Sequence, residues 1–427
     1  MKKSLFISLV GEFLSKFPLF GFEFLLAAKL SLYDYAFWSS LLLLYRFSPY
    51  LHFGVLSYFN KRYPLMLGRN RQESKKRIAR QVNKSINLIA LLIFILAILF
   101  LFLDIINFKH FIVIVTISFI QIYTYSQAVL RNEGEFLHFT IGLLLFSGFQ
   151  FIFSLVMVDE IGIWGAILSV FFGYLVSILY YVKISNVDFN WGMIRLNDLI
   201  RITKLGLVPF LLTISAFFVQ VSDRIALFIV DDTTLMASYG FFAIFLQLGI
   251  VMVNSIGKVM SPYIITKVGR DGASSTLSLC IYNVYIICFV YLIFFMGCYL
   301  YGDFFVNKFF QNFSGSILGV LNYGTVGFLL AIGLTFYPQL IAVNKEKTVI
   351  YLNFISSAFL VVAVYFGATL FKGYLVFSSL SLLINSCVVY LLVLLLEKKL
   401  EVNLKSVKLI VAVIFVNTFF VGQYVWN

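Results

Sequence analysis

Two oppositely charged side chains stand next to each other inside an apolar stretch of the sequence. Asp223 and Arg224 lie within FFVQVSDRIALFIV, residues 217 to 230. A charged side chain at the centre of a bilayer costs about 2.5 to 3.5 kcal/mol, even on scales taken from insertion experiments. A carboxylate and a guanidinium kept at such a depth indicate either a structural ion pair or a site that binds charged cargo or couples to an ion.

The first apolar stretch carries three more charges at helical spacing. Glu12, Lys16 and Glu23 lie within about 40° of one another on an ideal helix, although Pro18 predicts a kink between them. We expect one polar stripe that points into a helix bundle. Glu12 and Lys16 have the spacing of an i, i+4 ion pair, and Glu23 is a candidate for binding a cation or a proton.

Two further cations interrupt other apolar stretches. Arg46 precedes Pro49 by three residues, in the middle of its stretch, where an unwound turn would expose it. Lys258 lies near the end of its stretch, so it fits a functional cation and a charge that sets topology equally well.

The elements that must hold these charges are long apolar segments. The chain has 427 residues, of which 61% are hydrophobic and only 12% are charged, a composition too apolar for soluble domains. A helix that crosses about 30 Å of hydrocarbon needs about 20 apolar residues. Twelve runs meet that length: 4–28, 35–58, 86–104, 111–130, 137–158, 163–182, 205–230, 236–262, 276–298, 317–342, 349–370 and 374–396. Residues 409–425 form a short thirteenth run, which either crosses the membrane or lies in its interface.

The apolar runs are continuous, whereas the strands of a transmembrane barrel would alternate over about ten residues. The sequence therefore predicts an all-α polytopic membrane protein with about 12 transmembrane helices. The N-terminal run has no small-residue cleavage site and is interrupted by charges, so we expect it to be a retained first helix instead of a signal peptide.

Positive charge predicts the orientation of the chain. With a cytoplasmic N-terminus, 24 of the 32 Lys and Arg residues fall on the cytoplasmic side. The other side receives only four: Lys29, Lys109, Lys308 and Lys372. The net charge of +13 is therefore mostly a consequence of topology. The densest segment, residues 61–85, is predicted to be a positive-inside loop with an amphipathic part resting on anionic head groups, and not a nucleic-acid site.

Several enzyme classes find no support in the sequence. It contains no Walker, HExxH or GxSxG motif, and its four cysteines have no metal-ligand spacing. We therefore expect no catalytic residue, no metal site and no cofactor, and membrane transport is the function that remains.

The chain divides into two halves of similar design. Tyr35 and Tyr239 each open a long apolar run with a Tyr-(Ala/Gly)-Phe element. The polar segment 183–204 at the midpoint predicts a cytoplasmic linker between lobes of six helices at 1–182 and 205–396, followed by a basic and apolar tail at 397–427.

Residues 204–262 carry a distinctive pattern: Pro209 in the seventh helix, the Asp223 and Arg224 pair, Tyr239 and Gly240 at the start of the eighth helix, and Pro262 at its end. In this segment most specifically, and in layout over nearly the whole chain, the sequence resembles the MOP superfamily, and within it the Wzx-type flippases of O-antigen and capsule assembly. The chain departs from the family at Ala36, where a glycine usually follows the tyrosine.

The resemblance implies two six-helix bundles around a central cavity with alternating access, in the bacterial inner membrane. It implies as cargo an oligosaccharide repeat unit on undecaprenyl diphosphate, moved by an H⁺ or Na⁺ gradient, with polymerase and chain-length proteins of the same pathway as partners. The cations proposed to bind the diphosphate or sugar are Arg46, Arg224, Lys258 and Lys16. The acids proposed to couple the ion are Glu12, Glu23 and Asp223.

Three other functions fit a chain of this hydropathy. A multidrug exporter of the same superfamily would share the fold, but such exporters lack the extra cavity cations. A lipid II flippase would bind a similar diphosphate but usually has fourteen helices. An O-antigen polymerase, which is an enzyme, typically needs a sizeable periplasmic loop, whereas the longest outer loop here is residues 299–316.

Overall fold

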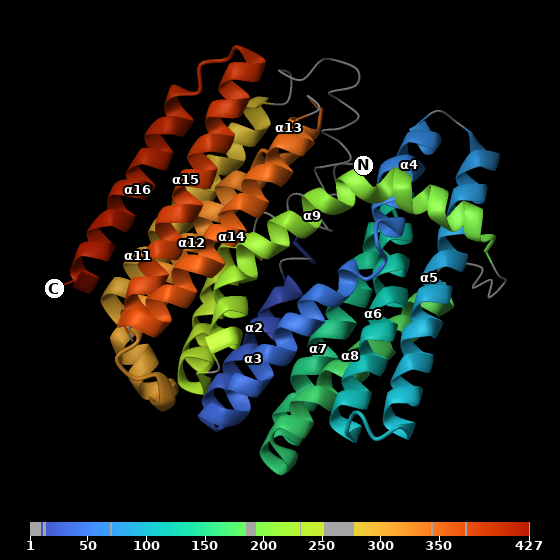
Figure 1. Cartoon of the computed structure of the whole chain (residues 1–427), viewed down its shortest axis with the longest axis horizontal. Coiled ribbons are helices and arrows are strands. Elements are labelled where there is room, and N and C mark those ends of the chain that lie inside the picture. The colour runs from blue at the N-terminus through green and yellow to red at the C-terminus, as the bar shows by residue number, and fades with distance from the viewer. Residues whose placement is uncertain are drawn as a thin grey trace. The chain divides into compact units, whose positions relative to one another are not determined.

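The computed structural model describes residues 10–11, 14–68, 71–184, 194–230, 232–251, 277–342, 345–371 and 374–426. All regular structure in these residues is helical (Figure 1). The longer helices are α2 (Lys16–Lys29), α3 (Leu32–Phe47), α4 (Val55–Gly68), α5 (Gln72–Phe102), α6 (Phe108–Glu133), α7 (Phe136–Ile161), α8 (Ile163–Ile184), α9 (Leu196–Val230), the helix Thr233–Val251, α11 (Leu277–Phe309), α12 (Ile317–Thr335), α14 (Glu346–Phe371), α15 (Tyr374–Leu400) and α16 (Lys405–Trp426). The short helix α13 spans Tyr337–Ala342.

The predicted fold class is confirmed. Ten helices in the described ranges are long and apolar enough to cross a membrane. The protein is therefore an all-helical, multi-pass membrane protein, and about 12 transmembrane helices fit the chain. The tail forms a single helix, α16, whose 22 residues reach about 33 Å at 1.5 Å per residue.

The predicted span 35–58 is wrong as a continuous helix. α3 ends at Phe47, a 3₁₀ turn covers Ser48–Tyr50, and α4 starts only at Val55. Phe53 and Gly54 adopt φ angles of 46° and 92°, which end the helical path between the two segments.

Side chains of the protein satisfy the backbone at this break. The Gln121 Nε2 atom of α6 donates to the Ser48 carbonyl at 2.6 Å, and the Gly54 N–H donates to His52 Nδ1 at 3.1 Å. Non-helical backbone at membrane depth is tolerated where the protein itself supplies such partners. His52 is thus a packed, hydrogen-bonded residue.

Other helix ends also differ from the apolar runs. α5 begins at Gln72, so the basic segment before residue 86 is helical instead of a loop. α11 continues to Phe309 through most of the predicted outer loop 299–316. The predicted span 317–342 is divided at Phe336 into α12 and α13. A hydropathy pattern locates apolar residues, but a helix continues as far as its backbone hydrogen bonds do. α5 and α11 are therefore longer than the apolar runs that predicted them.

The chain forms two compact units. Unit 1 contains residues 1–30 and 41–214, and unit 2 contains residues 31–40 and 215–427. The first turns of α3 belong to unit 2 because they pack on the helix Thr233–Val251, where a Cβ atom on Gly240 would collide with the Ser39 hydroxyl. Residues 185–193, in the middle of the predicted linker, lie outside the described residues.

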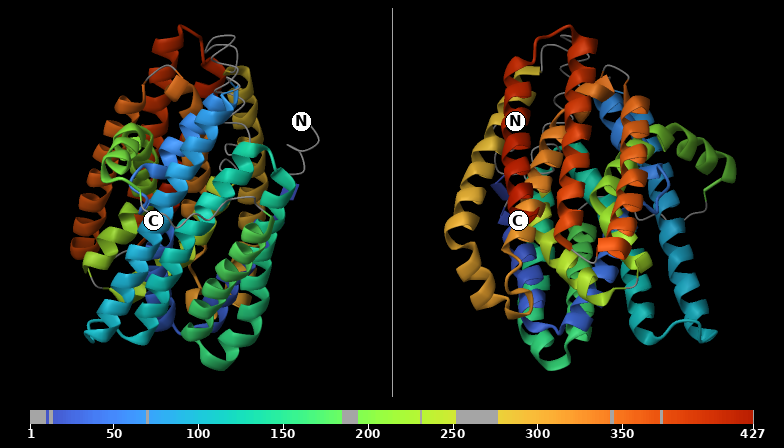
Figure 2. Two further views of the ribbon diagram at one scale, coloured as in Figure 1. Left: turned by 90° about the vertical axis from the view of Figure 1, so that its right-hand side faces the viewer. Right: turned by 60° about the vertical axis from the view of Figure 1, so that its left-hand side comes forward.

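In unit 1, hydrogen bonds from side-chain hydroxyls to backbone carbonyls connect neighbouring helices. α7 and α8 pack closely along their lengths (Figure 2). Between them, the Tyr181 hydroxyl donates to the Phe139 carbonyl at 3.0 Å, and the Ser177 hydroxyl donates to the Gly142 carbonyl at 2.8 Å. The small residue Gly142 leaves room for the Tyr181 ring, so these helices approach closely.

Unit 2 is built around α12. With 83% of its apolar window inside the protein, α12 is the most deeply buried of the ten candidate spans. α11, α15 and α16 pack against it, and Figure 2 shows α15 and α16 side by side. At the end of this pair, Lys408 forms an ion pair with Glu397.

Candidate functional site

Asp223 and Arg224 lie in the part of α9 that belongs to unit 2. The surrounding sequence is apolar and contains no proline after Pro209, so the helix runs without interruption past both residues to Val230. Only 4% of Asp223 and 1% of Arg224 are exposed. A buried ion pair of this kind needs hydrogen bonds from its surroundings, because removal of the charges from water is costly.

Both oxygens of the Asp223 carboxylate accept hydrogen bonds. Oδ1 accepts from the backbone N–H of Arg224 at 2.8 Å, and Oδ2 accepts a short bond from the Tyr323 hydroxyl of α12. Tyr323 is completely buried. α9 and α12 are therefore joined by a charge-assisted hydrogen bond, the stronger class of hydrogen bond in proteins.

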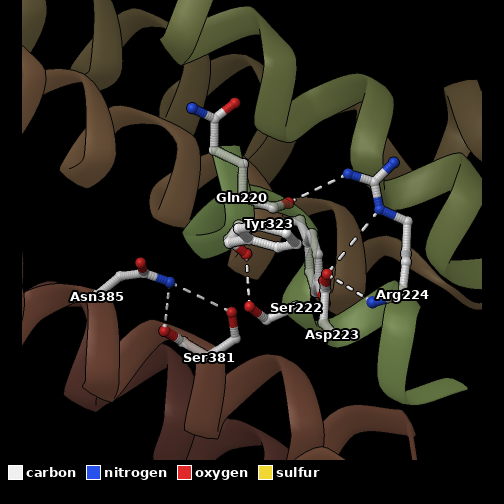
Figure 3. Close-up of polar contacts among 8 residues, drawn as sticks. Gln220, Ser222, Asp223, Arg224, Tyr323, Ser381 and Asn385 are labelled. Atoms are coloured by element: carbon white, nitrogen blue, oxygen red, sulfur yellow. Dashed lines mark hydrogen bonds and ion pairs between the residues drawn. The ribbon is translucent and has the colours of Figure 1, made fainter. Parts of the chain in front are cut away.

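The Arg224 guanidinium is less fully compensated (Figure 3). Its Nη2 atom donates to the Gln220 carbonyl at 3.1 Å, and its Nε atom lies 3.9 Å from Asp223 Oδ1. Within the described part of the chain, Nε and Nη1 are buried and have no hydrogen-bond acceptor. The ion pair is thus long. The carboxylate is fully hydrogen-bonded, whereas the guanidinium keeps donors that could bind an anion.

The Tyr323 ring, whose hydroxyl bonds to Asp223, packs against a second tyrosine from another helix. The Tyr239 and Tyr323 rings meet edge to face, with centroids 5.3 Å apart and an interplanar angle of 83°. The sequence singled out Tyr239 but missed Tyr323, which lies 100 residues from Asp223. One signal was present, since Tyr323 and Gly324 repeat the Tyr-Gly pair of Tyr239 and Gly240.

A second polar group was also missed by the sequence analysis. The Asn353 amide on α14 donates to the Ser215 hydroxyl at 3.1 Å and to the Tyr337 hydroxyl at 2.8 Å. A cavity of about 10 Å³ is lined by Asn353, Tyr337 and Gln220 among apolar side chains. This volume holds about one water molecule, so the cavity is far too small for a cargo.

The remaining predicted site residues lie in unit 1 or outside the described residues. Lys16 and Glu23 are half-buried on α2 in unit 1. Arg46 lies in the last turn of α3, directly before the 3₁₀ turn, and the unwound turn that the sequence indicated beside it is present. Glu12 and Lys258 lie outside the described residues, as does Pro262. Their assigned roles stay predictions.

Replacement of Tyr323 by phenylalanine is expected to destabilise the fold by about 1.5 to 3 kcal/mol, because the buried Asp223 carboxylate loses a hydrogen-bond donor. Thermal unfolding of the purified protein in detergent measures this change. Tyr299, which is 72% exposed on α11, provides a matched control. Equal stability of the Tyr323→Phe and Tyr299→Phe variants would show that the bond contributes nothing.

Comparison with known proteins shows similarity in structure only. No family model and no curated protein matches the sequence. The inward-facing conformation of a multidrug resistance MATE family transporter of the MOP superfamily has a TM-score of 0.70 and 14% identity, over 91% of this chain and 94% of that one. The chain has the MATE fold.

Two other solved structures carry the same fold. The outward-facing conformation of a multidrug resistance MATE family transporter of the MOP superfamily gives a TM-score of 0.68 at 14% identity, over 94% of this chain and 96% of that one. A MOP superfamily transporter from Pyrococcus furiosus Vc1 (DSM3638), reported with a binding pocket of reverse polarity, gives 0.66 at 13% identity, over 94% of this chain and 96% of that one.

Proposed function

We propose that this chain is a MOP superfamily transporter that moves undecaprenyl-diphosphate-linked oligosaccharide repeat units, such as those of O-antigen, from the cytoplasmic to the periplasmic leaflet. The fold supports membrane transport, and its neighbours have been solved in inward-facing and outward-facing conformations. Those two states support alternating access as the mechanism of this chain.

The observation that carries the choice of cargo is the buried guanidinium of Arg224. Two of its nitrogen atoms have no acceptor among the described residues, whereas both oxygens of Asp223 are engaged. Diphosphate oxygens are strong acceptors for arginine, and a membrane-depth cation with spare donors suits an anionic head group. Arg46, Lys16 and Lys258 are the further cations that we propose for this cargo.

Ion coupling is the second part of the proposal. Asp223 is a buried carboxylate whose hydrogen-bond partner, Tyr323, comes from another helix. Binding of H⁺ or Na⁺ at such a carboxylate would weaken its bond to Tyr323 and change the contact of α9 with α12 within unit 2. An ion gradient could drive the conformational change through this contact. Glu12 and Glu23 are the other acids that we propose for coupling.

Multidrug export is the principal alternative, because the structural neighbours include multidrug resistance transporters. The buried Asp223 carboxylate is the observation in its favour, since cationic drugs need an acidic partner. A drug would first have to displace Tyr323 and the Arg224 backbone from that carboxylate. We therefore favour an anionic cargo over a cationic drug.

A polymerase is disfavoured by the outer side of unit 2. α11 reaches Phe309, a 3₁₀ turn covers Gln311–Phe313, and α12 starts at Ile317, so little of the predicted loop 299–316 is irregular. We propose a transporter without enzyme activity, located in the inner membrane with its N-terminus in the cytoplasm. Polymerase and chain-length proteins of the pathway are proposed as its partners.

Deletion of the gene tests the proposed function. We expect single undecaprenyl-linked repeat units to accumulate on the cytoplasmic face, measured with a periplasmic ligation or labelling assay, and the plasmid-borne gene should restore export. Single units that reach the periplasm and cap the lipid acceptor without being polymerised would instead identify a polymerase. Normal export combined with new sensitivity to cationic drugs would identify a drug exporter.

A further inference from the structure

The first half of α5 carries a row of cations on one side of the helix, here called the basic face. It consists of Lys76, Arg77, Arg80 and Lys84. On an α-helix these four positions fall within an arc of about 100°. Lys76, Arg77 and Arg80 are exposed and Lys84 is half-buried, so all four can contact a ligand outside the protein.

The opposite side of the same helix is fixed in the core of unit 1. Ile78, Val82 and Ile86 are buried in one hydrophobic cluster with side chains of α4 and α6. The Tyr125 hydroxyl of α6 donates to the Ala79 carbonyl at 3.1 Å. The segment is therefore a rigid helix and not an amphipathic piece lying flat on the membrane, because its apolar face is already used by the protein.

No acidic side chain among the described residues forms an ion pair with the basic face. The neighbouring Lys75 shows the contrast: its ammonium group lies 3.4 Å from Glu133 and 5.2 Å from the centre of the Tyr63 ring. The four cations of the basic face form no ion pair or hydrogen bond with the described residues. Glu73 lies within the arc of this face, but the four cations leave it with a net positive charge.

The length of α5 places this face at the membrane surface. Its 31 residues extend about 46 Å, whereas the hydrocarbon core is about 30 Å thick. Since the C-terminal part of α5 is the apolar one, the excess length projects at the N-terminal end. Lys84 and Arg80 then lie near the head groups, with Arg77 and Lys76 one to two turns farther out.

Topology alone does not require this arrangement. The positive-inside rule depends on the number of Lys and Arg residues in a segment, and not on their alignment along one helix face.

We propose that the basic face binds the head groups of anionic phospholipids in the leaflet from which the N-terminal end of α5 emerges. The cations extend over about 12 Å and none is deeply buried, which suits several phosphate groups on a surface better than one ligand in a pocket. This inference does not depend on the proposed function.

The experiment uses the full chain in nanodiscs that contain spin-labelled phosphatidylglycerol or spin-labelled phosphatidylcholine. Electron paramagnetic resonance gives the relative association of each lipid with the protein. We expect wild type to prefer phosphatidylglycerol, with a preference that falls as salt is raised. One variant removes the basic face: Lys76→Gln, Arg77→Gln, Arg80→Gln and Lys84→Gln.

In that variant the association at this face should fall by about fivefold for each charge removed, and the total preference for phosphatidylglycerol should drop accordingly. The matched control loses the same net charge at exposed positions elsewhere: Arg195→Gln, Lys398→Gln, Lys399→Gln and Lys405→Gln. The control should retain most of the preference. Thermal unfolding verifies that both variants are folded, and the five Lys and Arg residues left between Lys61 and Lys84 preserve the orientation.

Equal lipid preference in the two variants would overturn the proposal, because the effect would then follow net charge alone. An unchanged phosphatidylglycerol preference, with weaker association of spin-labelled undecaprenyl diphosphate, would also overturn it, since the face would then serve a carrier lipid. Neither result would bear on the gene-deletion test of the proposed function.

Discussion

Replacement of Arg224 by alanine is expected to abolish translocation while the protein still inserts in the membrane. The guanidinium is buried, and two of its nitrogen atoms have no acceptor among the described residues, so they are available to an anion. We expect at least a tenfold loss of repeat-unit export, measured by the periplasmic labelling assay in the deletion strain. The Arg224→Lys variant should retain part of the activity, because it keeps the charge but not the planar fork.

The control for this experiment separates transport from folding. Loss of one partner from a buried ion pair costs about 3 to 5 kcal/mol, so Arg224→Ala also leaves Asp223 uncompensated. The Asp223→Asn, Arg224→Ala double variant removes both charges and should recover stability without recovering export. Arg201→Ala, at an exposed position on the same helix, should leave export unchanged. Full activity of Arg224→Ala would remove this residue from the mechanism.

Replacement of Gly327 by alanine is expected to prevent stable packing of unit 2. A Cβ atom there would collide with the Leu246 carbonyl oxygen and lie 2.9 Å from its Cα atom. Gly249 faces the same crossing, where a Cβ atom would collide with the Gly327 backbone. Both obstacles are backbone atoms that cannot rotate away, so we expect a cost at the upper end of the usual 1 to 3 kcal/mol for overpacking, or about 3 kcal/mol.

The yield of monodisperse protein and its unfolding temperature in detergent measure this effect. Gly297 on α11 supplies the matched control, since a Cβ atom there meets nothing within 4 Å. Gly297→Ala should be neutral or slightly stabilising, because alanine favours the helix over glycine. Similar behaviour of the two variants would show that the close approach of the helices is not needed for stability.

The sequence predicted the class of the fold because transmembrane helices must satisfy their backbone internally, and their apolar length is visible locally. It was incomplete where distant residues complete the structure. Pro49 indicated the unwound turn after Arg46, but nothing local indicated that Gln121, 73 residues from Ser48, donates to the Ser48 carbonyl there. The helical start of α5 had a local signal, since Ile78, Val82 and Ile86 repeat every four residues, but the density of charge favoured a loop.

In the candidate site, too, the sequence predicted some features and missed others. Asp223 and Arg224 are conspicuous in the sequence because charges are rare in apolar runs. Their environment was not predictable, since the partner of Asp223 comes from α12 and the Asn353 group joins α9, α13 and α14. Tyrosine and asparagine recur along these helices, so nothing local distinguishes those that bond across helices from those that do not.

The interrupted segment between α3 and α4 has a consequence for the order in which the protein is made. Residues 35–58 enter the membrane as one hydrophobic stretch, long before the ribosome has reached Gln121. The Ser48 carbonyl then has its local donor, the Leu51 N–H at 3.0 Å, and gains the Gln121 amide at 2.6 Å only later. Pro49 has no N–H and opposes an uninterrupted helix, so the break does not need α6 in order to form. The break is thus set early by the chain itself and fixed late by α6, and a chain that stops before α6 should already carry it.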